Sequence, residues 1–194
     1  MNEKTSSVEE KIIFATIDCI EKYGISGATN RQIVQAAGVN LAAINYYFHS
    51  KDNLIQECMK ITLRNAFDLS DIPSMQGSSA QERCIVILMH LFQGGFLYQN
   101  LTRAHFHNLL VEGRPDLLLE EHINLFIDRL AKDLIERGCT LEMDDLKLSL
   151  IQIVSAVFFA ILAPTLFEQR HEISLHNPDT CLAYVTRLVK KLLE

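Results

Sequence analysis

Residues 29–54 read TNRQIVQAAGVNLAAINYYFHSKDNL, and this stretch decides the fold. Thr29 and Gln32 have the spacing of a capping box, in which each residue satisfies a free backbone N-H of the other, so a helix is predicted to begin here. Gly38 is expected to end that helix, because glycine readily adopts the left-handed conformation common at helix C-termini. Asn40 can cap a second helix that begins at Leu41. The stretch therefore predicts two short helices joined by a tight turn.

The second of these short helices is predicted to have an apolar side and an uncharged outer side. Leu41, Ile44 and Phe48 recur at helical spacing and are expected to face inward. A helical wheel then turns Ala42 and Tyr46 outward. The flanking positions are Ala43, Asn45 and Tyr47. Two short helices after a longer amphipathic one form a three-helix unit whose last helix can enter the major groove of DNA.

Apolar residues recur at three- and four-residue spacing along nearly all of the 194 residues, which predicts an all-α fold. A longer helix from about Val8 to Tyr23 precedes the two short ones, and Ser50 can cap the next helix. The N-terminal helix-turn-helix DNA-binding domain is assigned to residues 1–54 and a C-terminal helical ligand-binding and dimerisation domain to residues 55–194, with the loop-like run 71–78 near the junction. Further helices are expected at 79–98, 101–112, 115–137, 142–169 and 178–193.

Composition limits the compartment and the kind of nucleic-acid binding. The polar first residues lack the apolar stretch of a secretory signal, and the five cysteines contain no C-x-x-C pair, so we expect a cytoplasmic protein with reduced cysteines. The net charge of −6 disfavours a protein that coats nucleic acid non-specifically. Residues 1–54 hold five Lys or Arg against six Asp or Glu, which argues against DNA binding. Any DNA binding must therefore come from a local surface.

The uncharged run from Leu148 to Phe167 is about as long as a membrane-spanning helix, which needs about 20 residues. Polar Ser149, Gln152 and Ser155 interrupt it. A helix buried in a bundle or at a dimer interface tolerates such residues, so no membrane span is expected.

The A-G-V turn ending at Val39, the Tyr46-Tyr47-Phe48 run and the S-K-x-x-L motif that ends at Leu54 keep a common spacing. With their surroundings they resemble the TetR family of regulators over about residues 8–55. The rest of the chain resembles that family only in length and in being helical. The resemblance implies a set of DNA-binding residues, namely Thr29, Arg31, Asn40, Ala42, Ala43, Asn45, Tyr46, Tyr47 and Lys51.

The chemistry of these side chains agrees with that implication. Arg31 can contact phosphate or guanine, Asn45 can pair with adenine, and Ala42 or Ala43 can touch a thymine methyl. At the other end of the helix, the tyrosines and Lys51 would meet phosphates, Lys51 beside a helix N-terminus that favours anions.

Other interpretations of these residues remain open. Tyr47 can instead belong to the small core beside Phe48, and Arg31 and Lys51 can be solvated charges. The sequence departs from the common family pattern at Asn45, where an aromatic is frequent, and at Leu41, where a polar residue is frequent.

The C-terminal half supplies more large apolar side chains than a small core needs, which predicts an apolar pocket for a hydrophobic or amphipathic small molecule. The candidate ligand-binding residues are Met89, Phe92, Phe96, Phe106, His107, Phe126, Phe158 and Phe159. Most of them can equally be ordinary core. His105 and His107 point to different sides of a helix and no zinc motif accompanies them, so neither a metal nor another cofactor is expected.

A homodimer is predicted from two helices near the C-terminus. Residues at near-heptad spacing on the last helix are Leu182, Val185, Val189 and Leu192. Small residues that let the preceding helix approach a partner are Ser155, Ala156, Ala160 and Ala163. Such a dimer would place two recognition helices about 34–36 Å apart, or a multiple of that distance.

The sequence thus predicts a regulator that binds double-stranded DNA at a palindromic operator and responds to an unidentified small-molecule effector, acting as a repressor. Two alternatives are an adaptor that binds only protein, which would suit the acidic balance, and a helical enzyme. The enzyme lacks a G-x-S-x-G motif and a phosphate-binding glycine loop.

Overall fold

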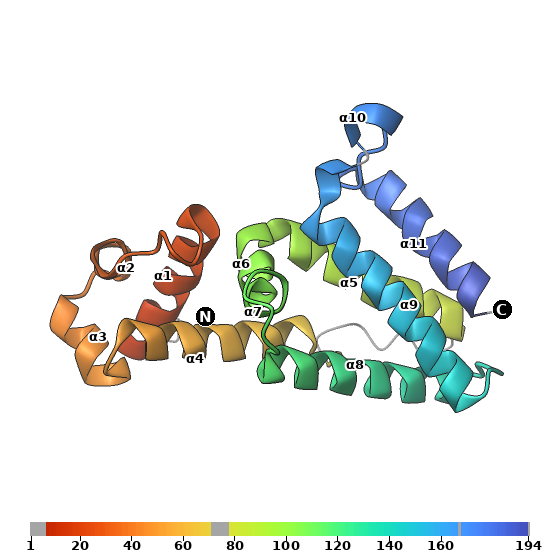
Figure 1. Ribbon diagram of the computed structural model, residues 1–194. Helices are drawn as coiled ribbons and strands as arrows, with labels where there is room; N and C mark the ends of the chain where they lie inside the picture. The colour runs from red at the N-terminus through yellow and green to blue at the C-terminus, as the bar shows by residue number, and fades with distance from the viewer. Residues whose placement is uncertain (1–6, 71–77, 167, 194) are drawn as a thin grey trace, which may run out of the picture. The chain divides into compact units, whose positions relative to one another are not determined.

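The computed structural model describes residues 7–70, 78–166 and 168–193, and within these ranges every regular element is a helix (Figure 1). The expected all-α fold is confirmed. The elements are α1 (Val8–Tyr23), α2 (Asn30–Ala37), α3 (Leu41–Phe48), α4 (Lys51–Ala66), α5 (Ala80–Leu97), α6 (Gln99–His105), α7 (His107–Leu110), α8 (Leu117–Glu136), α9 (Met143–Leu162), the 3-10 helix η1 (Pro164–Leu166), α10 (Glu168–His171) and α11 (Pro178–Leu192).

The chain forms two compact units that are not simply its two halves. The first unit combines the residues up to Asn65 with Tyr98–Asp116, and the second combines Ala66–Leu97 with the residues from Leu117 onward. The first unit thus includes most of α4 and also α6 and α7, because α6 packs against α1. The functional boundary between residues 54 and 55 stays a prediction, and the predicted junction loop 71–78 lies, apart from Ser78, outside the described residues.

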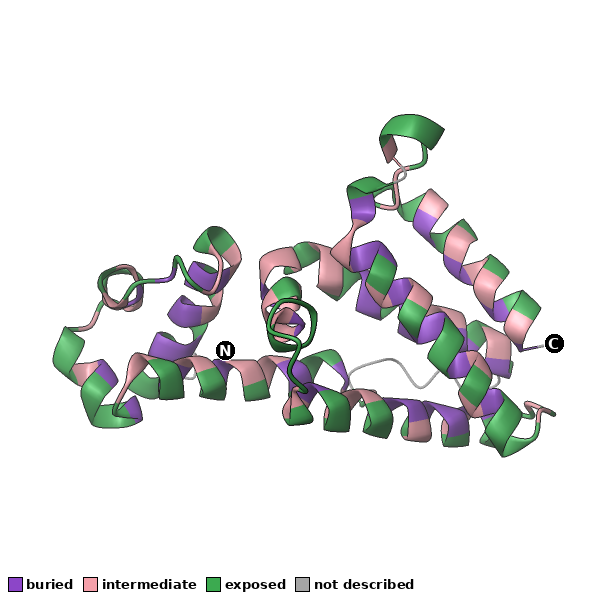
Figure 2. Ribbon diagram, viewed as in Figure 1, coloured by how far each residue is buried: buried purple, intermediate pink, exposed green. Residues whose placement is uncertain are grey.

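The first unit has a core built from all of its main helices. Ile12 and Ile20 of α1, Ile33 of α2, Ile44 of α3 and Leu54 of α4 are all fully buried. Figure 2 shows the buried side of α1 and the exposed outer side of α3. Helix α2 packs against α1 and α3, and the buried side chains of α2 and α3 join one apolar cluster with those of α1 and α4. Helices of eight residues would not be stable alone.

The second unit is centred on α5, which packs against α8, α9 and α11. Its interior is apolar: Phe92, Leu130, Leu150 and Val185 come from these four helices and are fully buried. The large apolar surface expected of the C-terminal half is therefore mostly used as core.

Two of the expected helices end earlier than predicted. The segment 101–112 is split into α6 and α7 at Phe106, whose φ of −88° and ψ of −1° interrupt the regular helix. The segment 142–169 stops at Leu162, because Ala163, with φ of −130° and ψ of 53°, leaves the helical conformation ahead of Pro164. Proline disfavours helical geometry at the residue before it.

Candidate DNA-binding interface

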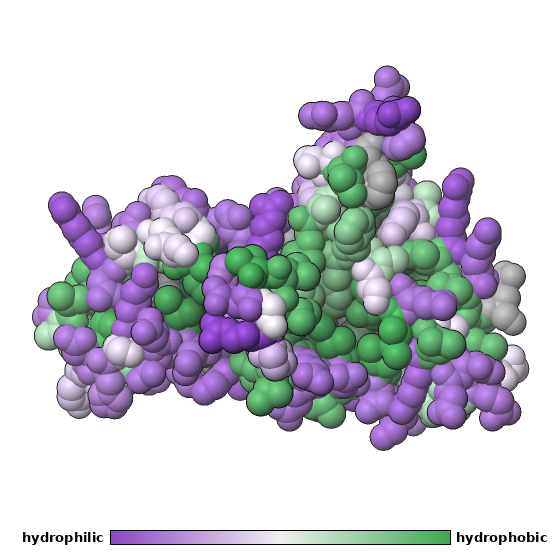
Figure 3. Space-filling view, in the orientation of Figure 1, coloured by the Kyte–Doolittle hydropathy of each residue, from purple (hydrophilic) through white to green (hydrophobic). Residues whose placement is uncertain are grey.

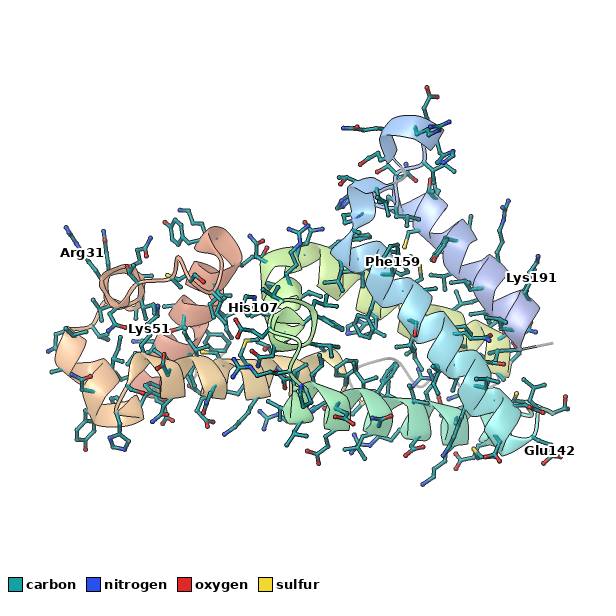
Figure 4. The ribbon with its side chains drawn as sticks, viewed as in Figure 1. Arg31, Lys51, His107, Glu142, Phe159 and Lys191 are labelled. Carbon is teal, nitrogen blue, oxygen red and sulfur yellow. The ribbon has the colours of Figure 1, made fainter. Side chains whose placement is uncertain are left out.

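The start of α2 has the predicted capping box. The Thr29 backbone N-H donates to Gln32 Oε1 at 2.8 Å, and the Gln32 backbone N-H donates to Thr29 Oγ1 at 3.3 Å. Thr29 is exposed, but its hydroxyl is thus engaged in the cap. Arg31, in the first turn of α2, is exposed and projects away from the helix (Figure 4).

Gly38 makes the turn between α2 and α3. Its φ of 66° and ψ of 33° are left-handed, as predicted, and its N-H donates to the Val34 carbonyl. The Val39 N-H donates to the same carbonyl at 3.0 Å. Val39 packs half-buried against the core, so this turn fixes where α3 starts.

The cap and the inner side of α3 follow the prediction with one exception. Asn40 Oδ1 accepts from the Ala43 backbone N-H at 3.1 Å. Ile44 is fully buried and Phe48 nearly so. The expectation that Leu41 faces inward is wrong, since its side chain is 50% exposed. Side chains of a helix lean toward its N-terminus, so that of Leu41, the first residue, extends beyond the core that Ile44 and Phe48 fill.

The outer side of α3 is exposed and carries no charged residue. Ala42 and Asn45 are exposed, Tyr46 is 77% exposed, and Ala43 is half-buried. Tyr47 is 40% exposed, and its ring meets that of Tyr46 edge-on with centroids 4.9 Å apart. The surface therefore offers methyl groups, one amide and two phenol hydroxyls.

A second helix N-terminus follows α3 directly. Ser50 Oγ accepts from the Asn53 backbone N-H at 3.1 Å, which confirms Ser50 as the cap of α4. Lys51, the first residue of α4, is half-buried beside the remaining free N-H groups. This arrangement suits a phosphate.

Helix α6 is attached to the same unit by polar contacts that the sequence analysis did not foresee. The backbone N-H groups of Asn100 and Leu101 donate to the two carboxylate oxygens of Glu21 at 3.3 and 3.0 Å. The Asn100 amide donates to the Glu21 carbonyl at 2.8 Å. At the other end, Thr62 Oγ1 and His105 Nε2 lie 2.9 Å apart. Partners 43 to 80 residues apart leave no local signal in the sequence.

Comparison with known proteins points to one family. Residues 12–58 match the family described as "Bacterial regulatory proteins, tetR family". The chain is 36% identical over 81 residues to the regulator BetI of Klebsiella pneumoniae, covering 40% of this chain and 41% of that protein. It is 26% identical over 119 residues to BetI 1 of Chromohalobacter salexigens, covering 59% and 57%. The chain thus spans about half the length of these relatives.

A solved structure extends the likeness of fold beyond the matched segment. The regulator FadR of Bacillus subtilis, in complex with stearoyl-CoA, superposes with a TM-score of 0.66 at 18% identity, covering 95% of this chain and 97% of that one. The match to the tetR family covers residues 12–58, and beyond that segment the likeness is one of fold. The matched relatives are named as transcriptional regulators, and these matches do not favour the enzyme alternative.

The ligand-binding candidates predicted from the sequence lie in different places in the structure. Phe126 and Phe158 both contact Phe67, with ring centroids 5.3 and 6.1 Å away. Phe92 and Phe96 form a second aromatic group, 5.5 Å apart. Phe67 was not among the predicted residues, because it lies just beyond α4 and its partners Phe126 and Phe158 are far from it along the chain.

The second aromatic group also has members that the sequence did not indicate. The ring of His176 lies 4.4 Å from that of Phe96, and the ring of Tyr184 lies 6.0 Å from that of Phe92. Met89 is half-buried near the Cys181 sulfur, at 3.8 Å. This aromatic group therefore reaches from fully buried Phe92, through half-buried Phe96 and Tyr184, to exposed His176.

Three candidates do not join either group. Phe106 and His107 belong to the first compact unit, where Phe106 is buried and His107 Nε2 lies 3.7 Å from a Glu112 carboxylate oxygen. Phe159 on α9 is 53% exposed (Figure 4). A role in ligand binding stays a prediction for all eight candidates. In the described ranges, no three His, Cys, Asp or Glu side chains gather in a way that would hold a metal ion.

Helix α9 exposes an uncharged line of side chains, which we call the α9 stripe. Its large members are apolar, and it comprises Leu148, Ile151, Gln152, Ser155 and Phe159. By length and composition alone this helix could cross a membrane, as could a core helix of a soluble protein. Figure 3 shows hydrophobic side chains on the visible face over this helix.

The expected dimer residues are divided between core and surface. Val185 and Val189 are fully buried within the second unit, and Ala160 is buried as well, so the expectation that these face a partner is wrong. Their spacing is that of any helix packed against neighbours, here α5 and α9. Leu182, by contrast, is 45% exposed and Ser155 is exposed.

Proposed function

We propose that this protein is a ligand-responsive transcriptional repressor that acts in the cytoplasm and binds a palindromic operator as a homodimer. The observation that carries the proposal is the exposed, uncharged outer side of α3, held by a capped and tightly turned helix-turn-helix. That surface suits the major groove, with Arg31, Lys51 and the tyrosines placed for phosphates on either side. The relatives named as regulators and the matched family agree with it.

The homodimer is supported by the α9 stripe. Exposed Leu148, Ile151 and Phe159 leave water when a second copy of α9 packs against them, and Ser155 at the centre allows close approach. Exposed Leu182 of α11 extends the apolar surface. A two-fold axis would present two α3 helices to one duplex, which is why the operator is expected to be palindromic.

The effector is proposed to be a hydrophobic or amphipathic small molecule bound among the aromatic side chains of the second unit. Two aromatic groups, around Phe67 and around Phe92, line its interior. FadR of Bacillus subtilis, which has the same fold, has been solved with stearoyl-CoA. An apolar interior with few polar groups matches that class of ligand.

Effector binding and DNA binding are proposed to oppose each other through α6. This helix follows α5 of the second unit directly along the chain, yet Glu21 and Asn100 attach it to α1 of the first unit. A ligand that shifts the end of α5 must therefore strain the first unit or release α6. Because coupling is reciprocal, the ligand would lower the affinity for DNA by the same factor as DNA lowers the affinity for the ligand.

The test is the affinity of the purified chain for palindromic fragments of its own promoter region, measured by fluorescence anisotropy at several salt concentrations. Binding is expected to weaken with salt, and Arg31→Ala to lose about 1–3 kcal/mol or to reduce the salt slope by about one. Tyr46→Ala should also weaken binding. Arg129→Ala, an exposed arginine on α8, is the matched control and should bind like the wild type. Binding unaffected by Arg31→Ala and Tyr46→Ala would contradict the proposal.

A further inference from the structure

The base preference of α3 follows from which of its side chains are exposed. On the helical wheel Leu41, Ala42, Asn45 and Tyr46 occupy one continuous exposed face. Leu41 and Ala42 begin the helix and Asn45 lies one turn further on. The N-terminal residues of the second helix contact base edges in helix-turn-helix proteins. The exposure of Leu41, 50%, adds an isobutyl group to that end.

This face favours some bases over others because it has no charged side chain. Guanine is read most often by Arg or Lys, and cytosine by Glu or Asp. None of these residue types occurs from Leu41 to Phe48. Arg31 lies on α2 and can reach a guanine only at a different position of the site. The methyl groups of Leu41 and Ala42 suit the thymine 5-methyl group, which projects into the major groove.

The capping bonds decide which of two amides can read adenine. Asn40 Oδ1 already accepts from the Ala43 backbone N-H, so Asn40 is poorly placed to pair with both N6 and N7 of adenine. Asn45 is exposed, and no side-chain hydrogen bond joins it to the rest of the described chain. Its amide therefore has both its donor and its acceptor to offer.

We propose that the operator half-site is read as A·T pairs: Leu41 and Ala42 bury thymine 5-methyl groups and Asn45 pairs bidentately with adenine. This inference rests on the proposed function and adds the sequence class of its DNA. Leu41 becomes a specificity-determining residue, although the sequence pattern placed it in the core.

The experiment begins with selection of duplexes from a random library by the purified full chain. Each thymine of the selected half-site is then replaced by deoxyuridine, which removes only the 5-methyl group, and each adenine by 7-deazaadenine, which removes only N7. Affinity is measured by anisotropy. The affinity of the wild type is expected to fall about fourfold for each buried thymine methyl group that is removed.

Variants assign the contacts to residues. Leu41→Ala should bind the thymine duplex more weakly than the wild type but lose its sensitivity to at least one deoxyuridine. Asn45→Ala should lose its sensitivity to one 7-deazaadenine. Leu109→Ala is the matched control, because Leu109 on α7 is exposed to the same degree, 49%, and should keep the wild-type pattern.

Two results would overturn the inference while leaving the proposed function standing. One is selection of G·C pairs throughout the half-site, and the other is tight binding that no deoxyuridine and no 7-deazaadenine weakens. Failure to select any duplex would overturn the proposed function as well.

Discussion

Helices α3 and α9 both present uncharged surfaces to solvent, but with different chemistry. The exposed side of α3 mixes small methyl groups with the amide of Asn45 and the hydroxyls of Tyr46 and Tyr47. The α9 stripe is longer and offers mainly hydrocarbon from Leu148, Ile151 and Phe159. A surface that retains hydrogen-bonding groups suits a hydrated partner such as DNA, whereas hydrocarbon is stable only when it is covered.

The comparison shows that an uncharged exposed surface can have two different roles. On α3 it limits which bases can be read, and on α9 it marks a surface that another copy of the chain is proposed to cover. Variants of these surfaces and of the elements that support them test this distinction, beginning with the change that should have the largest effect.

Ser155→Arg places a cation in the middle of the α9 stripe. If the stripe is covered in a dimer, the dissociation constant of the dimer should rise roughly 100-fold or more, because an unpaired buried charge costs several kcal/mol. Operator affinity should fall with it. Analytical ultracentrifugation measures the change.

Asn124→Arg on α8 is the control for that experiment, since it adds the same charge at an exposed position outside the α9 stripe. It should leave the association state unchanged. A Ser155→Arg chain that dimerises as well as the wild type would show that the stripe is not the interface.

Gly38→Ala tests the turn that positions α3. Because φ at Gly38 is 66°, the alanine side chain should cost about 1–2 kcal/mol of unfolding free energy, even though its Cβ would meet no atom within 4 Å. Chemical denaturation measures the loss.

The matched change in the second unit is Gly94→Ala in α5, where there is equal space and no left-handed backbone. It should stabilise the chain by up to about 1 kcal/mol, since alanine favours the helix. If the two variants change stability in the same direction, the backbone argument for Gly38 is wrong.

Glu21→Ala removes the carboxylate that caps α6. Two backbone N-H groups lose their acceptor, so the unfolding free energy should fall by about 1 kcal/mol. The variant should also respond less to effector, with DNA release reduced while effector binding persists. Anisotropy titrations with and without effector would check this, and full release by Glu21→Ala would contradict a role for the cap in coupling.

The smallest effect concerns two capping boxes of different chemistry. Ser79 holds the Glu82 carboxylate through hydrogen bonds from its N-H at 2.9 Å and its hydroxyl at 3.0 Å, which lowers the pKa of Glu82. The box of α2 pairs Thr29 with neutral Gln32. A lowered folded-state pKa adds stability above the ordinary carboxyl pKa and loses it as pH falls through the lowered value.

Ser79→Ala should therefore destabilise the chain at neutral pH and progressively less in acid, whereas the cost of Thr29→Ala should not change with pH. Denaturation midpoints of both variants, measured between neutral and acidic pH, would show this difference in pH dependence. Equal pH dependence of the two variants would contradict this explanation.

Local signals in the sequence were enough to predict most of the first unit. The cap at Thr29, the turn at Gly38 and the burial of Ile44 depend on residues only a few positions away. The spacing of residues in the sequence therefore predicted them. Leu41 was misplaced because periodicity does not tell where a small core ends. The contact of Glu21 with Asn100 joins residues 79 apart, which no single-sequence pattern reveals.

In the second unit, residue spacing predicted fewer of the contacts. Val185 and Val189 have a spacing that suits both a dimer interface and an internal contact, and the structure places them inside. Phe67 and Phe126 come together only through the packing of α8, so the aromatic group was only partly predicted.

The central claim, that duplex DNA covers the outer side of α3, can be tested by thiol labelling of Ala42→Cys in a Cys139→Ser background. The other four cysteines are buried, and burial raises the pKa of Cys58 and Cys84 to about 12, so they should stay unreactive. The account predicts that saturating operator DNA slows maleimide labelling at position 42 but not that of Asn124→Cys in the same background. Undiminished labelling of position 42 in the DNA complex would contradict it.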